Sequence, residues 1–165
     1  MSERRNANGT AEETVPFPSV TWFERLAKCM REARSHHEKL GYVDCVVHFK
    51  VTDGGRGGAP WCVQVTFEEF EAIDVQEVSA PEGESPDFLL EASLATWQEM
   101  IESIAAGEGR PGLEHTLNRL SHMGTPMRVS SDDPLRRDKY FRYNQSFQTF
   151  VNASSSFRTI FPARG

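Results

Sequence analysis

Cysteine, histidine and serine are the side chains with which a small enzyme most often performs nucleophilic catalysis. In this chain they lack the spacing that such chemistry needs. Cys45 and His48 stand three residues apart in a segment with strand character, so their side chains point to opposite faces. No Gly-x-Ser-x-Gly turn presents a serine nucleophile. We expect no catalytic residue, although a small enzyme that pairs Cys62 or Cys45 with a distant histidine stays open as an alternative.

Metal ions and cofactors also lack a recognisable site. His36 and His37 are adjacent, which places them about 100° apart on a helix. No Cys-x-x-Cys, His-x-x-x-His or His-Glu-x-x-His spacing occurs. The glycine-rich segment 54–58 has no following Lys-Ser/Thr and joins two predicted strands, so it indicates a hairpin loop rather than a phosphate-binding loop. We expect neither a metal nor a cofactor.

Composition and charge limit the class of protein. The 165 residues fit one domain, and the net charge of −6 argues against a broadly basic nucleic-acid-binding surface. No apolar run approaches the roughly 20 residues that cross a bilayer. The cysteines are odd in number and have no paired spacing, which favours reduced thiols. We expect a soluble, cytoplasmic protein with no nucleic-acid partner and at most transient membrane contact.

The first element that could position a site is a helix. Thr21 and Glu24 form a capping box, apolar residues recur at helical spacing as far as Leu40, and Gly41 ends the segment. Strand patterns follow over residues 45–51, 61–67, 70–75, 87–92 and 124–129. Short turns join the first three of these strands, which predicts that they pair antiparallel.

Helical patterns separate and follow the later strands. Ser93 caps a helix with the apolar stripe Leu94, Trp97, Met100, Ile101 and Ile104, and a short helix carries Leu113, Leu117 and Leu120. Asp133-Pro134 starts a last helix whose aromatic stripe is Tyr140, Tyr143, Phe147 and Phe150. We expect one domain over residues 19–154, between a flexible N-terminal arm of residues 1–18 and a tail of residues 155–165.

The large apolar side chains have two interpretations. Packed solidly together they would form an ordinary core. However, Met100, Met123 and Met127 are flexible and polarisable, and with the aromatic residues they would make an adaptable wall that suits an apolar ligand. Periodicity alone favours the solid core and leaves the cavity open.

The order of these parts resembles the sterol carrier protein family, the non-specific lipid-transfer proteins with a sterol-binding domain. The resemblance covers residues from about 46 to 150 and rests on apolar positions in the hairpin 48–65 and in the strand 87–92. Its most telling part is the helix Leu94-Ala95-Thr96-Trp97-Gln98-Glu99-Met100-Ile101-Glu102-Ser103-Ile104. Residues 117–129 resemble the helix and final strand that follow in that family.

The resemblance implies an α+β fold in which helices cover one face of a five-stranded, mostly antiparallel sheet. Between the layers it implies an apolar tunnel that binds fatty acids, acyl-CoA, sterols or other lipids without chemistry. Its wall would include Phe88, Leu90, Trp97, Met100, Ile101, Ile104, Leu120 and Met127. We add Phe67, Phe147 and Phe150, which share the apolar faces of their elements. Together we call these the wall residues.

A basic cluster opens the last helix. Arg136, Arg137, Lys139 and Arg142, here called the basic segment, are candidates to bind a negatively charged head group. A solvated charged face is the other interpretation, and it is the more common role of such runs.

We therefore expect non-catalytic binding or transfer of a hydrophobic ligand. A second hypothesis is an accessory module that docks on an enzyme or forms a homodimer, with the aromatic last helix as its interface. That helix is unusually aromatic for the family, so it could equally line the tunnel or fill it.

Overall fold

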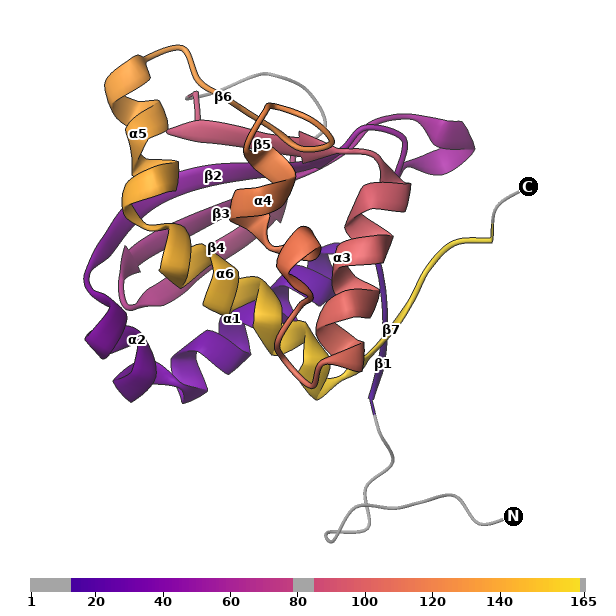
Figure 1. Ribbon diagram of the computed structural model, residues 1–165, viewed down its shortest axis with the longest axis horizontal. Helices are drawn as coiled ribbons and strands as arrows, with labels where there is room; N and C mark the ends of the chain where they lie inside the picture. Colours follow the sequence, from indigo (N-terminus) through magenta and orange to yellow (C-terminus); the bar gives the residue numbers. More distant parts are fainter. Residues whose placement is uncertain (1–12, 79–84, 164–165) are drawn as a thin grey trace, which may run out of the picture.

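A five-stranded sheet carries its helices on one face, as Figure 1 shows for the computed structural model, which describes residues 13–78 and 85–163. The strand order is β4-β3-β2-β5-β6; β2 and β5 are parallel and every other neighbouring pair is antiparallel. The strands are β2 (Val43–Val51), β3 (Trp61–Glu69), β4 (Glu71–Glu77), β5 (Phe88–Ala92) and β6 (Arg128–Ser130). The expected α+β, mostly antiparallel fold is confirmed.

The helices follow the strands in a simple order. They are α1 (Val20–Glu32), α2 (Arg34–Leu40), α3 (Leu94–Ala106), α4 (Leu117–Ser121), α5 (Pro134–Arg142) and α6 (Asn144–Asn152), with short 3-10 helices at Arg56–Gly58, Leu113–His115 and Ala153–Ser156. Within residues 13–78 and 85–163, no helix has both the length and the apolar character needed to cross a membrane.

Alternation along the central strand explains why the helices gather on one side. In β2 every second residue is buried, and this row of Val43, Cys45, Val47, Phe49 and Val51 forms the apolar face of the sheet. The ring of Phe49 lies 5.2 Å from Phe23 of α1, 6.2 Å from Trp97 of α3 and 6.3 Å from Phe150 of α6. Helices from distant parts of the chain therefore meet over one residue.

Most predicted helix ends are where the sequence indicates. The Ser93 side chain accepts from the Thr96 N–H at the start of α3, Asp133 accepts from the Leu135 N–H at the start of α5, and Gly41 ends α2. The capping box at Thr21 is wrong: Ser19 caps α1 instead, with its hydroxyl 3.0 Å from the Trp22 nitrogen.

Two helices predicted as continuous are each divided. The first is interrupted at Ala33, with φ −101° and ψ 29°, and the last at Tyr143, with φ −105° and ψ 19°. Beyond Met30 the apolar positions of the first helix, Ala33 and Leu40, are only half-buried, so little packing keeps it straight. The interruption at Tyr143 lets α5 pack on β5 and β6 while α6 packs toward β3 and α1.

The strand predicted over residues 124–129 forms later, at Arg128–Ser130, where it pairs with β5. Pro126 has no N–H to donate to the ladder, which explains why pairing begins after it. The strand predicted over 70–75 likewise lies at Glu71–Glu77, one residue beyond the turn at Phe70.

Parts of the predicted arm and tail belong to the folded domain, which corrects their boundaries. Thr14–Pro16 (β1) and Arg158–Ile160 (β7) form a two-stranded parallel sheet. Val15, Phe17 and Phe157 are buried because they pack against the aromatic residues of α1, with the rings of Phe17 and Trp22 4.8 Å apart. The remainder of the predicted arm, residues 1–12, lies outside the described residues.

Phe17→Ala tests this corrected boundary. We expect it to lower the free energy of unfolding by about 3–4 kcal/mol, because it removes a ring that contacts Trp22, Phe23 and Trp97. Ile73→Ala is the control, since the Ile73 side chain is 54% exposed and its loss should cost less than about 1 kcal/mol. Urea denaturation followed by circular dichroism measures both. Equal, small effects would mean that Phe17 belongs to a flexible arm.

Candidate functional site

The wall residues come together between the sheet and its helices. They lie on β3 and β5 of the sheet, on α3, α4 and α6, and immediately before β6. Their exposed fractions range from 0% to 6%, the largest being that of Leu120: Phe67, Phe88, Leu90, Trp97, Met100, Ile101, Ile104, Leu120, Met127, Phe147 and Phe150 are all buried. Elements separated by long stretches of sequence thus contribute to one apolar layer.

Aromatic rings fill one part of this layer. Phe67 of β3 lies 5.4 Å from Phe147 and 5.0 Å from Phe150, both on α6. Phe88 of β5 lies 5.4 Å from Phe147 and 5.4 Å from Tyr140 of α5. All four pairs meet edge to face in direct contact. Between these particular rings there is no room for an acyl chain while α6 stays in place.

Polar contacts fix the opposite side of the layer. The indole N–H of Trp97 donates to the Lys50 carbonyl at 3.1 Å, and the Asp53 carboxylate accepts from the Leu94 N–H at 2.7 Å. These bonds hold the start of α3 against the end of β2. One side of the layer is therefore α3, hydrogen-bonded to the sheet, and the aromatic side is α6.

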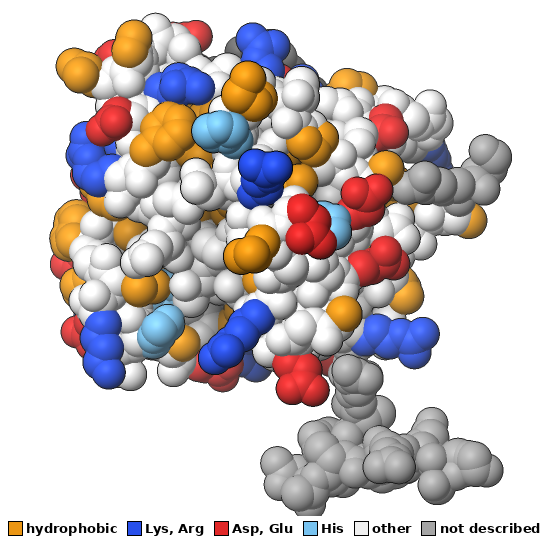
Figure 2. Space-filling model, viewed as in Figure 1, with side chains coloured by type: hydrophobic (Ala, Val, Ile, Leu, Met, Phe, Trp, Pro, Cys, Tyr) orange, Lys and Arg blue, Asp and Glu red, His pale blue; other side chains and the backbone are white. Residues whose placement is uncertain are grey.

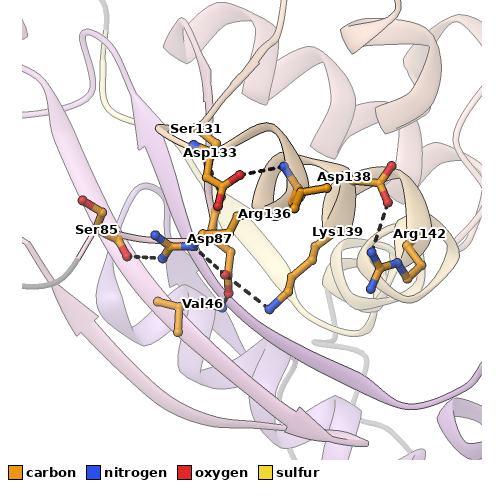
Figure 3. A network of polar contacts seen from close by, with 10 residues as sticks. Val46, Ser85, Asp87, Ser131, Asp133, Arg136, Asp138, Lys139 and Arg142 are labelled. Carbon is orange, nitrogen blue, oxygen red and sulfur yellow. Dashed lines mark hydrogen bonds and ion pairs between the residues drawn. The ribbon is translucent and has the colours of Figure 1, made fainter.

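The basic segment is largely engaged within the protein, as Figure 3 shows. Arg136 and Lys139 place their charged nitrogens 3.1 Å and 3.3 Å from one oxygen of Asp87. Arg142 forms an exposed ion pair with Asp138, and Arg137 donates to the Val129 carbonyl and lies over the Phe141 ring. The structure does not bring these cations together as a free cluster, so a head group would have to compete with internal partners.

Asp87 holds this region together and was not among the predicted site residues. Its side chain is buried, accepts from the Val46 N–H at 2.7 Å and joins β2 and β5 to α5. Its carbonyl accepts from the Ser131 hydroxyl at 2.6 Å. We call these contacts the Asp87 network. The sequence does contain a signal for Asp87. It is an acidic residue at the start of an apolar strand, and the later run of cations needs a counter-charge.

The charge state of Asp87 follows from this environment. Burial by itself raises the pKa of Asp87, but the hydrogen bonds from Val46 and Arg136 and the charge of Lys139 outweigh it. The pKa of Asp87 is therefore held below its ordinary value. The carboxylate stays ionised and keeps both cations in place.

The thiols are in a different electrostatic situation. Burial, and after it the nearby Asp87 carboxylate, raises the pKa of Cys45. Burial also raises the pKa of Cys62, to about 11. His48 hydrogen-bonds to Gln64 at 3.0 Å, on the face of the sheet opposite to Cys45. In the part of the chain that the structure describes, no three His, Cys, Asp or Glu side chains are grouped so that they could bind a metal ion.

Comparison with known proteins decides the fold. No family profile and no curated protein sequence matches the chain. Among solved structures, the crystal structure of sterol carrier protein 2 superposes with a TM-score of 0.61 at 19% identity, covering 83% of this chain and 95% of that one. This is the sterol carrier protein 2 fold. A conserved hypothetical protein of Thermus thermophilus, described as possibly a sterol carrier protein, gives a TM-score of 0.60 at 18% identity and covers 89% and 92% of the two chains.

The sterol carrier protein 2 fold accounts for the placement of the wall residues on the covered face of the sheet. The coverage of 95% of the sterol carrier protein 2 chain means that the layers match as a whole, and not through one hairpin. The resemblance stated from the sequence is confirmed as a likeness of fold.

Asp87→Ala tests the Asp87 network. It leaves the Val46 N–H and two cations without their acceptor, and we expect it to lower the free energy of unfolding by about 2–3 kcal/mol at pH 7. Asp138→Ala, which breaks only an exposed pair, should cost less than about 0.5 kcal/mol.

The same pair of variants checks the pKa of Asp87. A carboxyl with a depressed folded pKa contributes stability above its unfolded pKa of about 3.9 and loses it as the pH falls through the folded value. The stability difference between the wild type and Asp87→Ala should thus be constant above about pH 5 and shrink below about pH 4. A difference that grows on acidification would contradict the Asp87 network. Urea denaturation at each pH measures it.

Proposed function

We propose that this protein binds or transfers a hydrophobic ligand between its sheet and helices without catalysing a reaction. The ligand class is a fatty acid, acyl-CoA, sterol or other lipid. The observation that carries the proposal is the convergence of the wall residues on one buried layer in the sterol carrier protein 2 fold. The name of that neighbour supplies the ligand class.

Binding requires the rings on the aromatic side of the layer to move. The rings of Phe147 and Phe150 contact the sheet directly, so a ligand would take their place as α6 moves outward. The interruption at Tyr143 separates α6 from α5, which the Asp87 network ties to the sheet. Burying an alkyl chain gives about 0.8 kcal/mol per methylene, so a long chain can offset the lost ring contacts.

The alternative of an interaction module keeps only part of its predicted surface. Tyr140, Phe147 and Phe150 of the aromatic stripe are buried against the sheet, whereas Tyr143 is half-buried. Docking on an enzyme or as a homodimer stays a prediction without an assigned surface, and lipid binding is the function that the arrangement favours.

Lipid titration tests the proposal directly. The protein, stripped of bound lipid, should bind cis-parinaric acid and a fluorescent sterol at one ligand per chain with micromolar or tighter affinity, because the wall residues offer a continuous apolar surface. Fluorescence titration measures this, and native mass spectrometry gives the stoichiometry. Absence of binding to every acyl chain and sterol at micromolar protein would refute the proposed function.

A matched pair of ring variants locates the ligand. Phe150→Leu opens space beside Phe67 and should raise sterol affinity several-fold, because less ring contact must be broken. Phe157→Leu makes the same change beside Trp22, outside the wall residues, and should leave the affinity unchanged. The same gain in both variants would mean that general loosening, not space beside α6, controls binding.

Thiol labelling tests the proposed lack of catalysis. With a pKa of about 11, Cys62 carries little thiolate at pH 8, so iodoacetamide should modify it at least about tenfold more slowly than free glutathione. Cys45, more deeply buried, should react more slowly still. Peptide mapping resolves the two sites, and the unfolded protein is the control. Rapid labelling of either thiol in the folded protein would support the thiol-enzyme alternative instead.

A further inference from the structure

A depression of about 250 Å³ opens on the surface at α4, away from the basic segment. Its lining includes Arg119, His122, Leu120, Met123 and Pro126, with Glu114 at one side. The volume is below the range of about 300–1,000 Å³ typical of pockets that enclose a whole drug-sized ligand. It fits one end of a larger amphiphile rather than an entire lipid.

The depression combines cationic and apolar chemistry. Arg119 and His122 are three residues apart on and just after α4, so their side chains lie on the same side. Among the described residues neither side chain forms an ion pair, whereas the cations Arg136, Lys139 and Arg142 do. The Glu114 carboxylate, which also lines the depression, lies 3.6 Å from a ring nitrogen of His115. A guanidinium and an imidazole are thus free to donate to an anion.

One wall residue, Leu120, also lines the depression. Leu120 lines the depression and is only 6% exposed, so its side chain lies between the surface and the buried layer. Its carbonyl accepts from the N–H of Met127, another wall residue, at 3.1 Å. Met123, which is 80% exposed, adds a flexible apolar side chain at the rim.

The short helix α4, which lines the depression, is hydrogen-bonded to residues of α5 and α6. The Tyr140 hydroxyl donates to the Leu117 carbonyl at 3.0 Å, and the Gln148 side chain accepts from the Leu117 N–H at 2.8 Å. α4 therefore rests on α5 and α6, the same helices whose rings line the aromatic side of the layer. On the face shown in Figure 2, apolar, cationic and acidic side chains are interspersed without one broad apolar patch, which fits a small amphiphile better than a large docking partner.

We propose that the depression at α4 binds the carboxylate end of a single-chain fatty acid. Arg119 and His122 donate to the carboxylate, and the chain passes Leu120 toward the wall residues. This inference rests on the proposed function and moves the head-group role away from the basic segment. It makes Arg119 and His122 residues that select acids over uncharged lipids of the same length.

Paired ligands test the assignment. In Arg119→Gln the affinity for a fluorescent fatty acid should fall about three- to tenfold, and the affinity for the corresponding fatty alcohol should stay the same, because only the acid presents a charge. The loss should become smaller at high ionic strength, since the contact is partly exposed. His122→Gln should show the same selectivity to a lesser degree. Arg56→Gln, in the distant hairpin loop, is the matched control and should alter neither affinity.

The possible outcomes separate this inference from the proposed function. If the wild type binds neither the acid nor the alcohol, the proposed function fails. If the wild type binds both and Arg119→Gln weakens both equally or neither, the assignment of the carboxylate to α4 fails while lipid binding stands. Circular dichroism and a urea titration of Arg119→Gln check that folding is intact, which the exposure of Arg119 leads us to expect.

Discussion

One face of the central strand is entirely apolar, and covering it determines where the long helices must lie. Phe49 sits in the middle of that face and contacts rings from α1, α3 and α6. Burial of apolar area is the dominant favourable term in folding, so these helices have one common partner surface and no alternative on the other, half-exposed face. The layer between sheet and helices, in which the proposed ligand would lie, is a direct consequence of this one-sided pattern.

The same pattern creates a competition between core and ligand. A layer lined by large apolar residues can be filled by its own rings or, in the proposed function, by a lipid. Next to Phe67 and Phe88 it is filled by a ring of α6. The two sides differ in how firmly they are held. α3 is fixed to the sheet by the Trp97 and Asp53 hydrogen bonds, and α5 by the Asp87 network, whereas α6 begins at an interruption with no side-chain cap and its Gln148 side chain bonds to α4 rather than to the sheet. The proposed exchange of ring for ligand therefore concerns α6 in particular.

Local patterns predicted the helices, the strands and most of the helix ends, but not the interruptions within two of the predicted helices. Ser93, Asp133 and Gly41 act within one turn of chain, so their effects were visible in the sequence. The interruptions at Ala33 and Tyr143 depend on what each half of the helix packs against, which no helical repeat encodes. Val15 and Phe17 stand among polar residues and prolines, and they are buried by residues that the fold brings near, such as Trp22 of α1 and Trp97 of α3 beside Phe17.

The candidate site shows the same limit of prediction from sequence, because the fold decides whether a charged side chain already has a partner. The basic segment was the conspicuous candidate for an anion, yet a single buried carboxylate from a strand about fifty positions earlier takes up Arg136 and Lys139. An isolated buried charge is too costly to persist, so Asp87 requires these cations before any ligand does. Arg119 and His122 form no ion pair among the described residues, although they line a depression at the surface. The proposed carboxylate site therefore uses cations that the fold does not already need.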